Sequence, residues 1–412
     1  MEEKTIKNSK IPEIRFKGFT DAWEQRKLGE SSLYRRGSFP QPYGNPEWYG
    51  GENAMPFVQV ADVGNNMKLI NSTKQTISKL AQPMSVFIPK GSVVVTLQGS
   101  IGRVAITQYD AYLDRTVLFF EKFKQETNTN FWSYLIKNKF EYEARLAPGG
   151  TIKTITKEAL SDFDLILPKV GEQTKIGAFF SKLDNLITLH QRKYEKLLTM
   201  KKSCLEKMFP KNENKIPEIR FKGFTDAWEQ RKVSDLLTER NIQTPKSIEY
   251  PLMAFIQNQG VAPKGERYDR SSLVNDTENK LYKQTEYGDF IYSSNNLETG
   301  SIGLNKYGKA CISPVYSIFS PTGIADSDFI GRRFVRKDFI NEMVKWRQGV
   351  IYGQWRIHES DFLKIDITVP SLPEQRKIGD ILDKLDNLIT LHQRKLKMLQ
   401  NIKKSCLEKM FV

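Results

Sequence analysis

Two long stretches of the chain place apolar or seam residues in alternating steps of four and three, the first over residues 172–209 and the second near the C-terminus. A 4-3 alternation sustained this far is the heptad pattern of a coiled coil, so it predicts two long helices of about 50 Å each at 1.5 Å per residue. The predicted seam consists of Ile176, Phe180, Leu183, Ile187, His190, Tyr194 and Leu197 in the first helix and Ile378, Leu382, Leu385, Ile389, His392, Leu396 and Leu399 in the second.

The first helix carries further apolar residues beside the seam, namely Leu186, Leu189 and Leu198. They widen the stripe, and we expect them on a buried face. Two helices with nearly the same seam should pack on each other. Antiparallel pairing follows if a pseudo-two-fold axis relates the halves of the chain. Parallel pairing stays open from the sequence.

Outside these stretches the pattern is that of short strands mixed with helices. In the first half, strands are expected over residues 55–63, 92–97, 102–107, 115–120 and 163–168, with a helix over 131–146. In the second half, strands are expected over residues 250–257, 288–294, 311–320 and 363–370, with a helix over 338–348. The order is similar in both halves although the residues differ.

Parts of the two halves are identical in sequence. Residues 10–27 recur at 215–232, residues 182–193 at 384–395, and residues 201–209 at 403–411. A constant frame therefore holds two different inserts. The predicted fold class is α+β: two mixed α/β domains joined by two long helices that form an antiparallel coiled coil, with an internal pseudo-two-fold repeat. The expected division is residues 1–168 for the first domain, 169–210 for the first helix, 211–370 for the second domain and 371–412 for the second helix.

Composition indicates a globular protein with a polyanionic partner. The chain has 412 residues, 39% of them hydrophobic, and a net charge of +15. Such a basic excess favours nucleic acid, although a merely lysine-rich surface would give the same number. The three cysteines form no disulfide framework, and the polar N-terminus lacks a signal-peptide pattern, so we expect a cytoplasmic protein with no membrane partner.

Catalytic and metal-binding patterns are not recognisable in the sequence, so no catalytic residue and no metal ligand is predicted. The run from Gly303 to Ala310 fits most of a phosphate-binding loop, but a strand-like segment follows it, and we interpret it as a turn between strands. His190 and His392 occupy seam positions, where a polar residue sets register more often than it binds metal.

Each insert has loops in which small, amide, aromatic and basic residues gather. Arg pairs with guanine, Asn and Gln pair with adenine, and Gly or Ser lets the backbone approach phosphates. Taken singly, each is more often an ordinary polar loop. The candidate DNA-binding residues are Tyr34, Arg35, Arg36, Gln59, Gln98, Ser100, Arg103, Thr151 and Lys153 in the first insert and Gln257, Asn258, Asn295, Asn296, Ser301, Tyr352, Gln354, Trp355 and Arg356 in the second.

Three motifs complete a pattern over the whole chain. One is the block AWEQRKL at residues 22–28, with its counterpart before the second insert. Another is the Gly-Ser-Ile-Gly turn at residues 99–102 and 300–303. The third is a proline followed by Glu-Gln-x-Lys-Ile, with Pro168 before residues 172–176 and Pro373 before residues 374–378. With these motifs the chain resembles the DNA-specificity subunit of a type I restriction–modification enzyme.

That resemblance implies a non-catalytic subunit of a DNA adenine methyltransferase and restriction endonuclease complex. Each recognition domain would read one half of a split, asymmetric site in double-stranded DNA. The helices would set the gap between the halves and dock two methyltransferase subunits, with restriction subunits in the full complex. The chain would bind no cofactor itself, because S-adenosylmethionine, ATP and Mg²⁺ belong to the partner subunits.

Two other functions remain open from the residues. One is a non-catalytic coiled-coil scaffold that binds proteins without reading bases. The other is a complete enzyme with unrecognised chemistry, which the lack of a cofactor loop disfavours.

Overall fold

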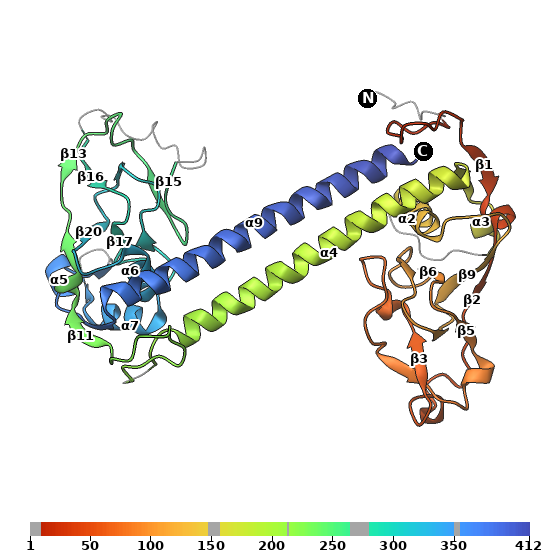
Figure 1. The fold of residues 1–412 in the computed structure, drawn as a ribbon, viewed down its shortest axis with the longest axis horizontal. Coiled ribbons are helices and arrows are strands. Elements are labelled where there is room, and N and C mark those ends of the chain that lie inside the picture. Colours follow the sequence, from red (N-terminus) through yellow and green to blue (C-terminus); the bar gives the residue numbers. More distant parts are fainter. Residues whose placement is uncertain (1–9, 147–156, 212–213, 264–279, 350–354) are drawn as a thin grey trace. The chain divides into compact units, whose positions relative to one another are not determined.

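Two long helices are the main feature of the computed structural model, which describes residues 10–146, 157–211, 214–263, 280–349 and 355–412 (Figure 1). Helix α4 spans Val170–Lys207 and α9 spans Leu372–Met410, 38 and 39 residues. Each is therefore about 57 Å long at 1.5 Å per residue. Every predicted seam residue is buried or half-buried, which confirms the two helices and their seam.

The chain forms two compact units, residues 1–192 with 393–412 and residues 193–392, and each contains part of both helices. In the first unit Lys403 pairs with Asp184 at 2.6 Å, and the Phe180 and Phe411 rings lie 5.9 Å apart. Residue numbers therefore fall along α9 as they rise along α4, so the predicted antiparallel pairing is confirmed. In the second unit, the repeat equivalents Lys201 and Asp386 form the same ion pair.

The extra leucines beside the seam are not buried, contrary to the prediction. Leu186 is 39%, Leu189 49% and Leu198 41% exposed, and their counterparts Leu388 and Leu391 are similarly exposed. The physical reason is that one partner helix covers only a narrow stripe, and residues outside that stripe face away from it.

The first unit contains two four-stranded sheets and a two-stranded pair. The strands are β1 (Glu24–Lys27), β2 (Ser32–Arg36), β3 (Met55–Val58), β4 (Gln75–Ile77), β5 (Val86–Ile88), β6 (Val93–Thr96), β7 (Val104–Ile106), β8 (Ala111–Leu113), β9 (Val117–Phe123) and β10 (Asp164–Leu167). They are ordered β2-β9-β6-β7, β4-β3-β8-β5 and β1-β10, and among the described strands of this unit only β3 and β8 pair in parallel. Helices α1 (Leu28–Ser31), α2 (Thr129–Leu146) and α3 (Lys157–Ser161) complete the unit.

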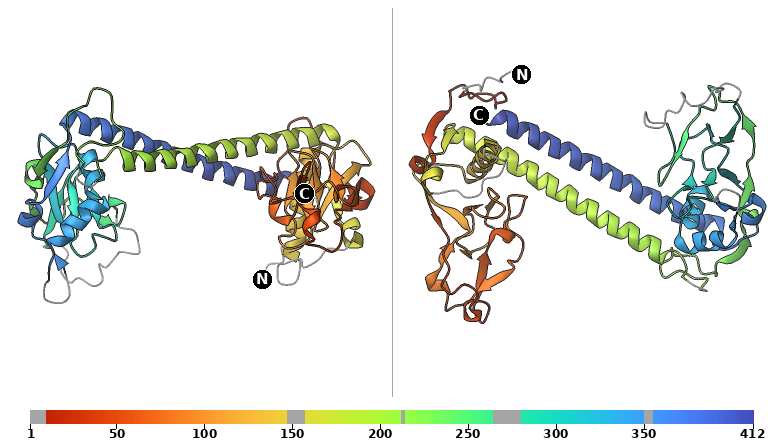
Figure 2. Two further views of the ribbon diagram at one scale, coloured as in Figure 1. Left: turned by 90° about the horizontal axis from the view of Figure 1, so that it is seen from below. Right: turned by 180° about the vertical axis from the view of Figure 1, so that it is seen from behind.

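The second unit, drawn from two further sides in Figure 2, repeats part of this topology. Its strands are β11 (Glu229–Lys232), β12 (Leu237–Glu239), β13 (Gln243–Thr244), β14 (Ala254–Ile256), β15 (Gly260–Ala262), β16 (Tyr282–Thr285), β17 (Phe290–Tyr292), β18 (Ile302–Leu304), β19 (Ala310–Ile312), β20 (Ser317–Pro321), β21 (Gln348–Gly349), β22 (Trp355–Arg356) and β23 (Asp366–Val369). The sheet β12-β20-β17-β18 corresponds to β2-β9-β6-β7, and β11-β23 to β1-β10. The remaining strands are ordered β13-β16-β19, β14-β15 and β21-β22. The helices are α5 (Val233–Leu236), α6 (Ser327–Phe334), α7 (Lys337–Lys345) and α8 (Glu359–Phe362).

Several elements of the second insert differ from the prediction, and two of the differences have a clear local cause. The expected strand over residues 311–320 is two strands, β19 and β20, because Ser313 and Pro314 begin a turn between them. Helix α6 was not predicted at all. It starts where the Asp326 side chain accepts a hydrogen bond from the Phe329 N–H at 2.9 Å, which is an N-cap.

A buried glutamate at the start of each long helix holds the repeated N-terminal block. Glu172 is 1% exposed and accepts two hydrogen bonds from Arg15, at 2.7 and 2.8 Å. Glu374, also 1% exposed, binds Arg220 at the same two distances. These hydrogen bonds raise the pKa of both arginines above its ordinary value, so both guanidinium groups stay charged. The glutamate of the Glu-Gln-x-Lys-Ile motif is therefore a structural anchor.

The glutamine of the same motif connects the long helix to the insert. Gln173 accepts from the Asn128 N–H at 3.1 Å and donates to the Pro168 carbonyl at 2.9 Å. Gln375 accepts from the Asp326 N–H and donates to the Pro370 carbonyl, both at 2.9 Å. The structural equivalent of Pro168 is thus Pro370, and not Pro373 as the motif suggested.

Each insert also donates hydrogen bonds to the helices, through residues that differ between the two units. Tyr134 donates to Asp184, the residue that also pairs with Lys403. In the second unit, Arg332 takes the place of the tyrosine and binds Asp386 at 2.9 Å.

One turn further along, the acceptors are backbone carbonyls of the other long helix. Asn138 donates to the Leu407 carbonyl, and Arg336 donates to the equivalent Leu205 carbonyl. The repeated frame therefore offers the same acceptors in both units, and each insert supplies its own donors.

We predict that Gly177→Ala destabilises the protein although alanine favours helices by about 1 kcal/mol. A Cβ at Gly177 would lie 2.3 Å from Asn128 Oδ1 and 2.8 Å from the Phe131 nitrogen, at the start of α2. Overpacking of this kind lowers the free energy of unfolding by about 1–3 kcal/mol. The matched control is Gly171→Ala in the same helix, where the nearest atom is 3.9 Å away. Thermal unfolding of both variants checks this, and equal melting temperatures would contradict it.

We predict that Glu374→Gln lowers the free energy of unfolding by about 3 kcal/mol, because Arg220 then lacks its buried charge partner. The control is Glu229→Gln, which breaks an exposed pair with Arg231 in the same unit and should change little. Denaturant unfolding measures both. If Glu229→Gln lowered the free energy of unfolding as much as Glu374→Gln, the buried pair would contribute no more to stability than the exposed one.

Candidate nucleic-acid interface

In the first unit, the ends of three strands meet the turn between β8 and β9. The Asp114 N–H donates to the Val58 carbonyl at the end of β3, and the Leu97 N–H after β6 donates to the Thr116 carbonyl at 2.8 Å. The Gly37 N–H after β2 donates to the Val117 carbonyl at 3.0 Å. Candidate residues that are distant in the sequence are therefore brought to one place.

The candidates of the first insert differ in how open they are. Arg35, Arg36 and Gln98 are exposed, whereas Ser100 and Arg103 are half-buried in the turn between β6 and β7. Tyr34 is half-buried, with its hydroxyl on Ser161 and its ring against Phe120. The structure thus places Tyr34 in a packing position and leaves the other side chains nearer to solvent.

Gln59 supports a neighbouring tyrosine that the sequence did not single out. Its amide donates to the Tyr43 hydroxyl at 2.7 Å, and that hydroxyl donates to Asp114 at 3.4 Å. Desolvation and the Asp114 carboxylate raise the pKa of Tyr43 to about 12, so the phenol stays protonated at neutral pH. The Arg115 guanidinium lies 5.6 Å from the centre of the Tyr43 ring. Tyr43, Asp114 and Arg115 were not among the residues predicted from the sequence, because they come close to the candidate loops only through contacts at the strand ends.

In the second unit, hydrogen bonds connect three of the candidate loops. Gln257 donates to the Thr299 hydroxyl at 3.1 Å, and the Asn258 N–H donates to the Gly300 carbonyl at 3.0 Å. The Trp355 N–H donates to the Asn295 side chain at 2.6 Å. The loops after β14 and β17 and the strand β22 therefore form one surface.

Most candidates on this surface are exposed, namely Gln257, Asn258, Asn295, Asn296, Trp355 and Arg356. Arg356 lies 3.7 Å from Glu359, and Ser301 is only 4% exposed. Four further candidates, Thr151, Lys153, Tyr352 and Gln354, lie outside the described residues.

The Gly-Ser-Ile-Gly motif closes the turn after β6 and after β17. Gly102 has a φ of +81°, and a Cβ there would lie 2.9 Å from Phe140. Gly300 has a φ of +97°, and a Cβ would lie 2.2 Å from Asn258 Oδ1. Only glycine fits both the backbone and the space at these positions. The motif is therefore explained by loop closure.

The phosphate-loop-like run is a turn, as predicted. Strand β18 ends at Leu304 and β19 begins at Ala310. Between them the buried Asn305 side chain accepts from the N–H groups of Tyr307, at 2.9 Å, and Gly308, at 3.1 Å. These amides are satisfied internally and are not presented to a phosphate.

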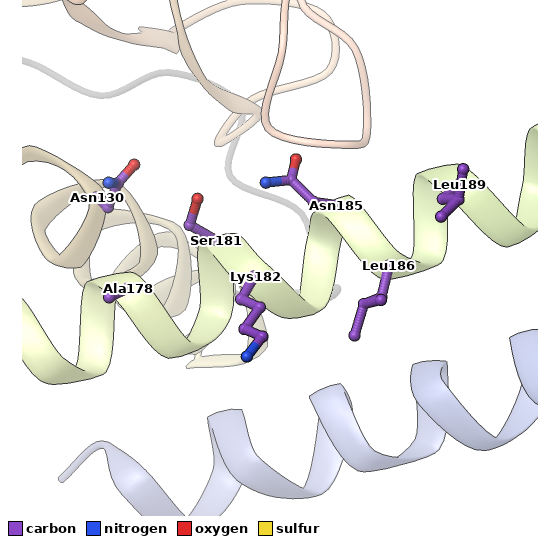
Figure 3. A pocket seen from close by; sticks show the side chains of 7 residues that line it. All are labelled: Asn130, Ala178, Ser181, Lys182, Asn185, Leu186 and Leu189. Carbon is purple, nitrogen blue, oxygen red and sulfur yellow. The ribbon is translucent and has the colours of Figure 1, made fainter.

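The exposed side of α4 borders a shallow hollow in the first unit (Figure 3). Its lining is Asn130, Ala178, Ser181, Lys182, Asn185, Leu186 and Leu189. The repeat keeps the lysine, the asparagine and both leucines in the second unit. Acidic residues replace the others there, and Lys306 bridges Asp328 and Asp383 at 2.8 Å each. The two copies of this surface thus share apolar residues and differ in charge.

Within the described part of the chain, no cluster of three or more His, Cys, Asp or Glu side chains could hold a metal ion. Among the described helices, none combines the length and the apolar character that a membrane-spanning helix needs.

Comparison with known proteins identifies the family. The model of the type I restriction modification DNA specificity domain matches residues 20–199 and 225–401, one copy in each half. The chain belongs to this family. It is thus a DNA-specificity subunit, and catalysis in such a system lies in other subunits.

Individual relatives align with nearly the whole chain. The MjaIX specificity subunit of Methanocaldococcus jannaschii is 21% identical and aligns over 94% of this chain and 92% of its own length. The MjaVIII specificity subunit of the same organism is 21% identical over 93% and 90%. A crystal structure of the type I restriction–modification S subunit from M. genitalium shares the fold, with a TM-score of 0.59, 16% identity and coverage of 98% and 99%.

Proposed function

We propose that each unit of this specificity subunit reads one half of a split site in double-stranded DNA with the strand-end loops described above. The observation that supports this is the convergence of exposed amide and guanidinium groups, all from the unrepeated inserts, at one surface in each unit. Such groups distinguish base pairs in the major groove. The net charge of +15 provides attraction to phosphates and makes binding depend on salt.

The two half-sites should differ, because the loops differ chemically. The first unit offers Gln98 and, over the Tyr43 ring, Arg115, whereas the second offers Asn295, Asn296 and the half-exposed Trp355. The site read by the whole subunit is then asymmetric, although the frame repeats.

The long helices are the part of the chain that both units share, and we assign them the gap between the half-sites. Successive major-groove faces of DNA are about 34–36 Å apart, which is within reach of helices of about 57 Å. Two methyltransferase subunits would dock on the repeated helix surface, where Leu186 and Leu189, and again Leu388 and Leu391, are exposed. Exposed leucines at repeated positions suit a protein partner.

The remaining partners follow from the same assignment. Restriction subunits would join the full complex, and S-adenosylmethionine, ATP and Mg²⁺ would be bound by the partner subunits. The place of action is then the cytoplasm, with the DNA. The alternative of a protein scaffold without base reading is disfavoured, because both halves match a DNA-specificity domain.

We predict that replacing residues 31–160 with the insert of another family member changes one half-site and leaves the other intact. The new insert should keep a hydrogen-bond donor in place of Tyr134, so that it still binds Asp184. Selection of DNA from a library with randomised half-sites, by the subunit together with its methyltransferase subunits, measures the outcome. The unchanged second half-site is the internal control, and a change in both halves would contradict modular reading.

A further inference from the structure

Arg115 is an exposed arginine at the centre of the loop surface of the first unit. It lies in the turn between β8 and β9, next to Asp114 and Thr116, whose backbones bind the ends of β3 and β6. No described carboxylate forms an ion pair with it. The nearest candidate in sequence, Asp114, is 2% exposed and accepts hydrogen bonds from Thr116 and Tyr43 instead. The charge of Arg115 is therefore open to a ligand.

The guanidinium is also held in place by an aromatic platform. It lies over the Tyr43 ring, whose hydroxyl is fixed by Gln59 and Asp114. Tyr43 in turn packs against Phe39 at 5.1 Å, and Phe39 is buried against Phe57 at 4.8 Å. An arginine held over such a platform keeps N–H donors available, and it loses less side-chain entropy when it binds.

We propose that Arg115 determines specificity by binding a guanine in the half-site of the first unit. Two parallel N–H donors match the O6 and N7 acceptors that guanine presents in the major groove, and this is the commonest base-specific contact of arginine. The inference rests on the proposed DNA reading and adds one residue and one base to it.

The same turn of the second unit differs in chemistry. The two turns correspond residue by residue, because the Val117 N–H donates to the Asp114 carbonyl and the Tyr316 N–H donates to the Ser313 carbonyl. Pro314 is therefore the counterpart of Arg115. The next residue, Val315, is 71% exposed, and an apolar side chain suits the methyl group of thymine. This turn thus predicts a guanine contact in the first half-site and not in the second.

The test is Arg115→Ala in the full subunit with its methyltransferase subunits, by selection from DNA with randomised half-sites at fixed salt. The expected result is that the wild type selects guanine at one position of the first half-site, and that the variant loses about 10- to 100-fold of that preference. The second half-site should stay unchanged. Because Arg115 is exposed, an unaltered melting temperature should accompany the loss.

Other outcomes overturn the inference in distinguishable ways. A uniform loss of binding with unchanged base preferences and a smaller salt dependence would make Arg115 a phosphate contact. The inference would also be overturned if the selection of guanine at every position of the first half-site were independent of Arg115. In both cases the wild type still selects a split site, so the proposed function stands. Failure of the wild type to select any sequence would instead contradict the proposed function.

Val315→Ala is the reciprocal control, and a change in the first half-site by this variant would contradict the assignment of one turn to one half-site.

Discussion

The buried carboxylate at the start of each long helix is the interaction on which the other contacts depend. Glu172 and Glu374 each bind an arginine of the repeated block, and the adjacent Gln173 and Gln375 bind the backbone at the start of α2 and of α6. A buried carboxylate without its cation would be strongly unfavourable, so the block, the helix and the domain must come together in one arrangement. The positions of the loops in each unit therefore depend on these buried contacts.

The contacts between frame and insert explain how a constant frame accepts different inserts. The frame supplies acceptors, Asp184 and the Leu407 carbonyl in one unit and Asp386 and the Leu205 carbonyl in the other. The inserts supply the donors, a tyrosine and an asparagine in the first unit and two arginines in the second. A carboxylate or a carbonyl accepts from any of these donors, so the attachment does not fix the rest of the insert. Loop chemistry is then free to vary.

The sequence predicted the frame better than the site. A heptad seam depends on local spacing, so both long helices followed from residues such as Ile176 and Ile378. Their antiparallel pairing was favoured by the internal repeat, with parallel pairing left open. The seam alone could not show that Leu186 and Leu189 stay exposed, because the number of packing partners is a tertiary property. Tyr43 and Arg115 escaped for a similar reason. They lie more than 70 positions apart, and strand pairing brings them into contact. Tyr34 shows the converse, since a residue within a promising loop packs inward.

The most direct test of this account is a map of methylated adenines in the genome of the host, with and without the gene for this chain. The account predicts one motif that disappears with the gene and consists of two different halves separated by an unread gap of constant length. A palindromic motif, a continuous motif or a methylation pattern that persists without the gene would contradict it.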